Sequence, residues 1–325
     1  MRYAWNLEWL ASSAKALRQV NISNGTRIPR CPRGDIASRR AGVPLFGALQ
    51  RLYPGVDERI RKTDHIITAP DGHEVLIYAF EREKDDCDEL RPAVLYIHGG
   101  GMMMSSAEDW ARTVQFDVAR TGVPHFSVDY RIAPEDPHPT PVEDCYAALI
   151  WMHSRANDFG IDKSRIAVAG FSSGGGLAAA VAILARDRGL QPKLARQVLL
   201  EPMLDDRNTV EDADLAPFVT WNWDDNWTGW NALLGASAGG DEVEPSAVPA
   251  RLDDFKGLPA TYIDCGNLDI FAEESEVYAK KLKEAGVAVE WHLYEGVPHG
   301  FELRGAGSAI FGKALENRWA ALRSL

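Results

Sequence analysis

Short apolar runs alternate with longer amphipathic segments along most of this 325-residue chain. Runs rich in apolar and β-branched residues predict eight strands, over 66–68, 75–80, 93–98, 125–129, 165–170, 198–201, 260–265 and 287–294. Amphipathic segments of helical length cover 107–120, 141–157, 173–188, 273–285 and 309–324. Strands that alternate with helices form doubly wound sheets, so we expect an α/β fold with a mostly parallel central sheet of about eight strands flanked by helices. The Asp71-Gly72 pair predicts an antiparallel hairpin between the first two strands.

Two stretches do not follow this alternation. Residues 1–55 are helical and loop-like, with tryptophans at helical spacing, and residues 205–250 are acidic, rich in tryptophan and interrupted by Gly and Pro. We expect both stretches to lie outside the sheet as the two parts of a helical cap, with residues 56–204 and 251–325 forming the core. The tryptophans near the start of the chain favour packing onto the domain over anchoring in a membrane.

Composition and charge narrow the possible functions. With 46% hydrophobic and 25% charged residues, the chain has the make-up of a globular enzyme. Its formal net charge of −12 repels phosphate backbones, so we expect no nucleic-acid partner. The longest nearly pure apolar stretch, 176–185, is about half as long as a bilayer crossing requires, and the first residues lack an apolar signal core. We therefore expect a cytoplasmic protein without stable membrane insertion.

Ser172 is the most informative serine, because the segment Gly-Phe-Ser-Ser-Gly at 170–174 has the Gly-x-Ser-x-Gly pattern of a nucleophile elbow. An elbow requires a strand that turns sharply into a helix, with glycines where a Cβ would collide with neighbouring backbone. Residues 166–169 form a buried-strand run and 177–182 open a strong helix, so Ser172 has this setting. Ser237 lies in a second match but runs into Gly-Gly-Asp-Glu, which predicts a loop serine.

A serine nucleophile needs a base to take its proton and N–H donors for the oxyanion that develops. The sequence His-Gly-Gly-Gly at 98–101 directly follows the predicted strand 93–97, and its glycines let bare backbone N–H groups approach a substrate oxygen. Taken alone, the run is equally compatible with a flexible glycine turn. We expect His98 to hold the loop in shape.

His299 is the predicted base because it lies on a loop just after the strand 287–294, where open α/β sheets place their chemistry. For the carboxylate that orients it, Asp264 lies within a strand and Asp269 beyond it, so Asp269 is favoured. Ser172, Asp269 and His299 then occur in the order nucleophile, acid, base. The other histidines are expected to be surface or packing residues: His65, His73, His125, His138, His153 and His292.

Taken together, the motifs resemble the hormone-sensitive-lipase-like group of α/β-hydrolases, the bacterial family IV type of carboxylesterase with a helical cap. The resemblance rests on the glycine run at 98–101, Val-Asp-Tyr-Arg-Ile-Ala-Pro-Glu at 128–135, the elbow, Leu-Asp at 268–269 followed by two glutamates, and Pro-His-Gly-Phe at 298–301. It runs from about residue 60 to the end of the chain, and it implies the α/β-hydrolase fold and ester hydrolysis.

The resemblance also implies roles for single residues. Ser172 would be the nucleophile, His299 the base and Asp269 its orienting carboxylate. The oxyanion hole would consist of three N–H groups, those of Gly100, Gly101 and Ser173. The family's usual elbow reads Gly-Asp-Ser-Ala-Gly-Gly, so Phe171 and the serine at 173 are departures, and Ile270 replaces the usual proline after the acid. The backbone N–H of residue 173 survives this change, so we expect the chemistry to persist and the substrate preference to differ.

The sequence therefore predicts a serine carboxylester hydrolase that cleaves short-to-medium acyl or aryl esters through an acyl-enzyme intermediate. Its partner would be a small-molecule ester, and a homodimer is one possible assembly. No cofactor is expected, and no metal, because the four cysteines lack paired spacing and no His-Glu-x-x-His motif occurs. The substrate is expected to contact four side chains in particular: Met102, Phe171, Trp221 and Trp223.

Other functions remain open at this point. A lactonase or a formamidase would use the same triad, since all these reactions pass through similar tetrahedral intermediates. A receptor that binds small ligands without hydrolysing them is also known on this scaffold, although such relatives have lost the histidine. A dinucleotide-binding fold would fit Gly-x-Gly-x-x-Ala at 174–179, with Glu201 ending the next strand, but it leaves the other motifs unexplained.

Overall fold

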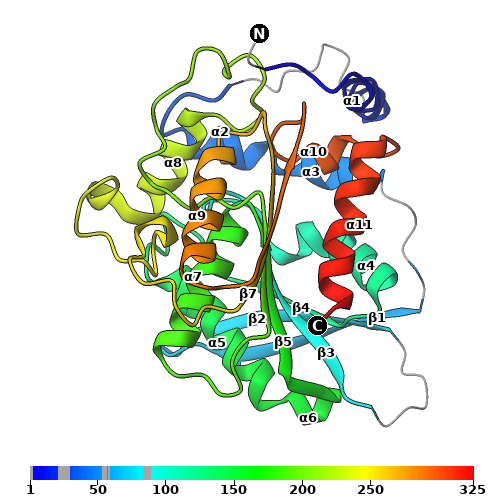
Figure 1. Ribbon diagram of the computed structural model, residues 1–325, viewed down its shortest axis with the longest axis vertical. Helices are drawn as coiled ribbons and strands as arrows, with labels where there is room; N and C mark the ends of the chain where they lie inside the picture. The colour runs from blue at the N-terminus through cyan, green and yellow to red at the C-terminus, as the bar shows by residue number, and fades with distance from the viewer. Residues whose placement is uncertain (1–2, 21–29, 53–56, 58, 83–88) are drawn as a thin grey trace.

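A single eight-stranded sheet organises the chain, in the order β1-β2-β4-β3-β5-β6-β7-β8 (Figure 1). The structure is a computed structural model and describes residues 3–20, 30–52, 57, 59–82 and 89–325. The strands are β1 (Ile60–Thr68), β2 (Glu74–Arg82), β3 (Arg91–Ile97), β4 (His125–Asp129), β5 (Ile161–Phe171), β6 (Arg196–Leu200), β7 (Ala260–Gly266) and β8 (Val289–Tyr294). β2 pairs antiparallel with both β1 and β4, and the other pairs are parallel. The predicted fold, strand number and first hairpin are confirmed.

Two strands begin at least four residues earlier than predicted. β1 begins at Ile60 rather than at residue 66, and β5 begins at Ile161 rather than at residue 165. Both added portions are polar, Arg-Lys-Thr-Asp-His at 61–65 and Asp-Lys-Ser at 162–164, and their side chains are mostly exposed or half-buried. An edge strand such as β1, or the end of a strand outside the core, needs no apolar run, so hydrophobic pattern alone does not reveal it.

The two faces of the sheet carry separate helical layers, because successive side chains of a strand point to opposite faces. Val94 and Tyr96 of β3 pack in one apolar cluster, and Leu95 and Ile97 in another. In Figure 1, α4 and α11 cover one face and α5, α7 and α9 the other. The bounds of these helices are α4 (Ala107–Thr121), α5 (Thr140–Ser154), α7 (Ser173–Asp187), α9 (Ala272–Glu284) and α11 (Ala309–Arg323), close to the predicted ranges; a short α6 (Ala156–Phe159) follows α5.

Parts of the two predicted cap stretches contact each other. Helices α2 (Ile36–Ala41) and α3 (Val43–Gln50) belong to the first stretch and α8 (Trp223–Leu234) to the second. Arg39 of α2 and Asp225 of α8 form an ion pair at 2.7 Å, in which the two side chains are only 3% and 12% exposed. The same guanidinium also donates to three backbone carbonyls that precede or begin α2. The cap boundaries themselves remain predictions.

Helix α1 (Leu7–Gln19) packs elsewhere, against α10 (Phe301–Arg304) and α11. Trp9 is buried, and its indole N–H donates to the Phe301 carbonyl at 2.8 Å. The tryptophan stripe therefore packs onto the domain, as its sequence spacing predicted. No helix in the part of the chain that the structure describes is long and apolar enough to cross a bilayer.

The Arg39–Asp225 ion pair gives a prediction about stability. Removing one partner of a buried pair leaves an uncompensated charge, so Arg39→Ala should lower the free energy of unfolding by about 3 kcal/mol in urea titrations. Arg33→Ala is the matched control, because Arg33 pairs with the neighbouring Asp224 at 2.8 Å but is 45% exposed. The control should cost less than about 1 kcal/mol. Equal losses in the two variants would show that burial of the Arg39 pair does not stabilise the contact between α2 and α8.

Candidate active site

Ser172 lies at a sharp turn between β5 and α7. Its φ of 57° and ψ of −122° are strained for a residue with a side chain, which is the backbone geometry of a nucleophile elbow. The turn is held by the Ser172 N–H, which donates to the Leu200 carbonyl at 2.8 Å. A Cβ at Gly170 would lie 2.1 Å from the Gly174 carbonyl oxygen, and one at Gly174 would lie 2.1 Å from the Ile97 carbonyl oxygen. Both glycines are therefore required by close backbone packing.

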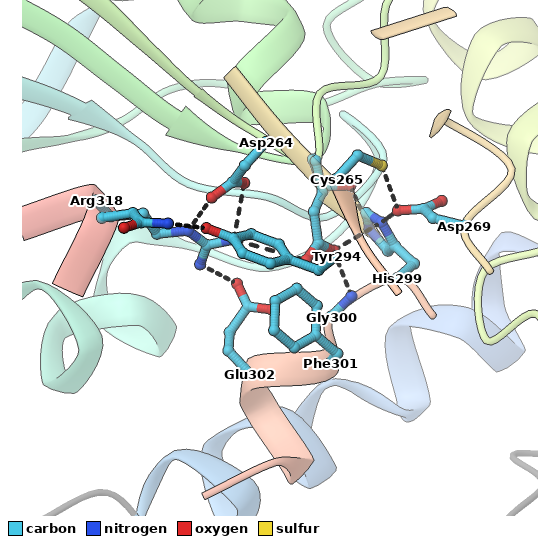
Figure 2. A network of polar contacts seen from close by, with 12 residues as sticks. Asp264, Cys265, Asp269, Tyr294, His299, Gly300, Phe301, Glu302 and Arg318 are labelled. Atoms are coloured by element: carbon cyan, nitrogen blue, oxygen red, sulfur yellow. Dashed lines mark hydrogen bonds and ion pairs between the residues drawn. The ribbon is translucent and has the colours of Figure 1, made fainter. Parts of the chain in front are cut away.

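The structure brings the three predicted triad residues together (Figure 2 shows the His299 and Asp269 side). His299 Nε2 lies 2.9 Å from Ser172 Oγ, and its Nδ1 lies 2.6 Å from Asp269 Oδ2. Asp269 is wholly buried, and its other oxygen accepts the Phe271 N–H at 3.0 Å. Because a carboxylate accepts at Nδ1, the imidazole carries its proton there, and Nε2 is left to accept from the serine hydroxyl.

Each of these side chains follows the end of a strand in the consecutive parallel set β5-β6-β7-β8, which explains why they meet. Ser172 follows β5, Asp269 follows β7 and His299 follows β8, all at the carboxyl edge where α/β sheets place their sites. Ser237 has a different setting. It ends a short 3-10 helix after α8, outside the sheet, and its side chain is exposed.

The glycine run after β3 borders the same cavity as the serine. Gly100 and Gly101 have φ values of 135° and 60°, which favour glycine, and both line the cavity with Ser172. Ser173 is the first residue of α7, where a helix leaves its N–H groups without intrahelical acceptors. Within the described part of the chain, no backbone hydrogen bond occupies the N–H groups of these three residues. They are therefore available to an oxyanion.

His98 supports this loop, as expected from the sequence. Its Nδ1 lies 2.8 Å from the Gly99 carbonyl oxygen, its ring stacks on Tyr130 with centroids 4.2 Å apart, and the Tyr130 hydroxyl donates to its carbonyl at 2.9 Å. Burial lowers the pKa of His98, so the ring is neutral near pH 7. The adjoining Arg131 forms a two-bond ion pair with the buried Asp144, at 2.7 and 2.9 Å.

The cavity beside Ser172 has a volume of about 80 Å³ and is almost entirely apolar. Of the four predicted substrate contacts, Phe171 and Trp221 line it. Met102 and Trp223 are instead buried in the main apolar core. Met102 has a φ of 60°, and Met104, two residues further on, lines the cavity. Trp223 is the first residue of α8, and its side chain is buried. Sequence reasoning did not find several further lining residues: Leu49, Met104, Trp110, Leu303 and Arg304.

Glu201 is a second carboxyl group beside the imidazole that sequence reasoning did not assign to the site. Its Oε2 lies 3.2 Å from His299 Nδ1 and accepts the Gly300 N–H at 2.5 Å. Together with Asp269 and His299 it forms a cluster that could hold a metal ion, the one such cluster among the described residues. In this structure the same atoms are engaged in hydrogen bonds with one another and with Gly300. The cluster therefore orients the imidazole.

The serine is strained and lies between a strand and a helix, and its hydroxyl contacts a histidine that also contacts a buried acid. This arrangement, on a sheet of this strand order, defines the α/β-hydrolase class. A family model for the alpha/beta hydrolase fold matches residues 94–303, and the chain belongs to this family. The resemblance to hormone-sensitive-lipase-like carboxylesterases is confirmed by the relatives that follow.

Several relatives of the chain are named esterases or ester hydrolases. The carboxylic ester hydrolase LipN of Mycobacterium tuberculosis is 30% identical over 273 residues, which cover 82% of this chain and 70% of LipN. The carboxylesterase NlhH of the same organism is 34% identical over 214 residues, which cover 65% of this chain and 66% of NlhH. The solved structure of a bacterial heroin esterase is similar with a TM-score of 0.85 and 34% identity, covering 97% of this chain and 96% of that one. The matches thus span about two thirds of the length of LipN and NlhH.

The Gly101 position gives a prediction for the oxyanion pocket. A Cβ there would lie 2.6 Å from Trp221, so Gly101→Ala should displace the backbone N–H and lower kcat about 10- to 100-fold. Gly72→Ala is the control, because Gly72 also has a positive φ but no atom within 4 Å of the added Cβ. That variant should lose about 1 kcal/mol of stability and keep its kcat. Steady-state kinetics on a short aryl ester would measure both, and full activity in Gly101→Ala would contradict the assignment.

Proposed function

We propose that this protein is a serine carboxylester hydrolase with Ser172 as nucleophile, His299 as general base and Asp269 as the carboxylate that orients it. The proposal depends on two contacts of His299. Its Nε2 lies 2.9 Å from Ser172 Oγ on the strained elbow, and its Nδ1 lies 2.6 Å from Asp269 Oδ2. The esterase names of its relatives support the same reaction.

The proposed reaction has two steps. His299 Nε2 takes the hydroxyl proton as Ser172 Oγ bonds to the ester carbonyl carbon, and the resulting oxyanion is stabilised by the N–H groups of Gly100, Gly101 and Ser173. The intermediate collapses as the C–O bond to the leaving alcohol breaks and the imidazolium returns the proton to the alcohol oxygen. Water then attacks the acyl-enzyme by the same route, which releases the acid and regenerates the serine.

The shape of the cavity bears on the substrate. A volume of about 80 Å³ lined by Phe171, Trp221 and Met104 favours short-to-medium acyl or aryl groups, since apolar pockets select by size and shape. Trp221 belongs to the proposed cap insertion 205–250, and the neighbouring Thr220 donates to the His299 carbonyl at 2.6 Å. We propose that the two cap stretches, 1–55 and 205–250, close the acyl site from above the sheet.

A lactonase or formamidase activity would use the same three side chains, and the leaving group distinguishes these reactions. A receptor without turnover is less well supported, because His299 is present and bonded to both partners. The cytoplasmic location and the homodimer stay predictions from the sequence.

Substitution of the nucleophile tests the proposal. Ser172→Ala should lower kcat on p-nitrophenyl acetate by at least about 10³-fold, because the hydroxyl cannot be replaced by neighbouring groups. Ser237→Ala is the matched control, since it removes the serine of the second Gly-x-Ser-x-Gly match from an exposed position. The control should leave kcat and KM unchanged. Near-normal turnover in Ser172→Ala, or loss of turnover in Ser237→Ala only, would remove Ser172 from the mechanism.

A further inference from the structure

Glu201 occupies an unusual backbone position at the end of β6. Its φ of 46° lies in the left-handed region, which is strained for a residue with a side chain, and its side chain is completely buried. The backbone N–H donates to the Asp264 carbonyl at 2.8 Å, which holds this conformation. Strained, buried polar residues persist where the surrounding structure fixes them, and they concentrate at functional sites.

One oxygen of Glu201 faces the catalytic loop. Oε2 accepts the Gly300 N–H at 2.5 Å and lies 3.2 Å from His299 Nδ1, while Asp269 Oδ2 lies 2.6 Å from the same nitrogen. The Nδ1 edge of the imidazole therefore contacts two carboxyl groups from two different strand ends. Gly300, with a φ of 64°, follows the histidine directly, so its contact with Glu201 also fixes the loop that carries the ring.

The other oxygen of Glu201 faces a buried ion-pair network (Figure 2 shows its Arg318 part). Oε1 lies 3.7 Å from Arg318 Nη2. Arg318 of α11 in turn binds Asp264 at 2.7 and 2.9 Å and Glu302 at 2.7 Å. All of these side chains are nearly inaccessible to water.

The network holds more carboxyl groups than cations. Asp264, Glu302, Asp269 and Glu201 surround the single guanidinium of Arg318 and the imidazole of His299. Three further titratable groups lie close to this network: Tyr262 donates to Asp264 at 2.8 Å, the Cys265 thiol donates to Asp269 at 3.5 Å, and the buried Asp117 adds another carboxyl group near Arg318 and Glu302. Full ionisation of the acids would leave buried charge without compensation, which proteins avoid by keeping one acid neutral.

Hydrogen bonding indicates which acid is neutral. Glu201 Oε1 and Glu302 Oε2 are both buried, and neither has a hydrogen-bond donor among the described residues when both groups are ionised. The two carboxyl groups are close enough for a side-chain hydrogen bond, so one proton between them would satisfy both oxygens. Burial, with the nearby Glu302 and Asp269, raises the pKa of Glu201 well above its ordinary value. Burial opposes the same ionisation in Glu302, but Arg318 and a hydrogen bond with Glu201 lower the pKa of Glu302. Glu302 accepts a hydrogen bond from Arg318 at 2.7 Å, whereas Glu201 Oε1 lies 3.7 Å from the guanidinium, so the negative charge belongs to Glu302 and the proton to Glu201.

We propose that Glu201 is a positioning residue for the catalytic imidazole. It acts as a neutral carboxylic acid whose O–H donates a hydrogen bond to Glu302, and its other oxygen holds Gly300 and the Nδ1 edge of His299. This inference rests on the function proposed above. A neutral acid at this place ties the His299 loop to the Arg318 network without adding a second negative charge beside the ring. A second charge would stabilise the imidazolium and make it a weaker acid toward the leaving alcohol.

Glu201→Gln tests the charge state, because glutamine keeps one acceptor for Gly300 and one donor for Glu302. We expect kcat within about threefold of the wild type, and a midpoint of the acidic limb of the pH profile of kcat/KM that moves by less than about 0.3 pH unit. An ionised Glu201 at 3.2 Å from Nδ1 would instead hold a charge whose removal lowers that midpoint by about 1 pH unit or more. A shift of that size would overturn the proposal.

Glu201→Leu tests the positioning role, because it removes both contacts. We expect kcat to fall about 10- to 100-fold, while KM stays within about threefold of the wild-type value. Glu201→Gln should instead keep a kcat close to that of the wild type. Glu274→Gln is the matched control: Glu274 is a buried glutamate of α9 that accepts the Leu204 N–H at 2.6 Å, away from His299. It should lower the thermal unfolding midpoint without changing kcat. Unchanged kcat in Glu201→Leu would overturn the positioning role.

An infrared measurement reads the proton directly and does not depend on turnover. The wild type minus Glu201→Gln difference spectrum at pH 7 should contain the carbonyl band of a protonated carboxylic acid, and a carboxylate band in its place would refute the proposal. Ser172→Ala separates this inference from the proposed function. If Ser172→Ala abolishes turnover but the charge or positioning test fails, only the proposed role of Glu201 is wrong. If turnover survives in Ser172→Ala, the proposed triad itself is wrong.

Discussion

Close backbone packing at the turn between β5 and α7 is the constraint on which the rest of the site depends. Gly174 approaches the carbonyls of Ile97 and His98 so closely that a Cβ would lie 2.1 and 2.4 Å from their oxygens. This contact presses the start of α7 against the end of β3. It therefore places the N–H groups of the first turn of α7 beside the glycine loop that follows β3, and it points the Ser172 side chain into the space between them.

The core strands could be predicted from sequence because they are buried on both faces and read as continuous apolar runs. The run Ile-Ala-Val-Ala at 166–169 is an example, and all four side chains are buried. The start of β1 could not be predicted in this way. Its residues 61–65 are polar, and only pairing with β2 through the register Arg61 to Glu81 and His65 to Ile77 defines it as a strand.

The meeting of Ser172, Asp269 and His299 was predictable because each residue follows a strand within a few positions, so local pattern and chain order were enough. The lining of the cavity was not. Met104 lines the cavity and Met102 does not, and the positive φ of Met102 between the glycine run and Met104 is a backbone feature that no hydrophobic pattern specifies. From the sequence, Glu201 could be recognised only as the last residue of a predicted strand. Its proposed role depends on contacts with Gly300 and Arg318, which lie about 100 residues further along the chain and reach it only through tertiary packing.

Asp264 and Asp269, near the end of β7, illustrate how the same side-chain chemistry is divided between two tasks. Asp269 lies beyond the strand and contacts the imidazole, whereas Asp264 lies within β7 and accepts two bonds from Arg318. The planar fork of an arginine suits this arrangement, because it can bind Asp264 with two nitrogens and Glu302 with the third; a lysine ammonium cannot match that geometry. A buried ion network of this kind adds little net stability, since desolvation offsets its attraction. Its consequence is geometric: α11, α10, β7 and the end of β6 are fixed relative to one another, and the histidine loop is held between them.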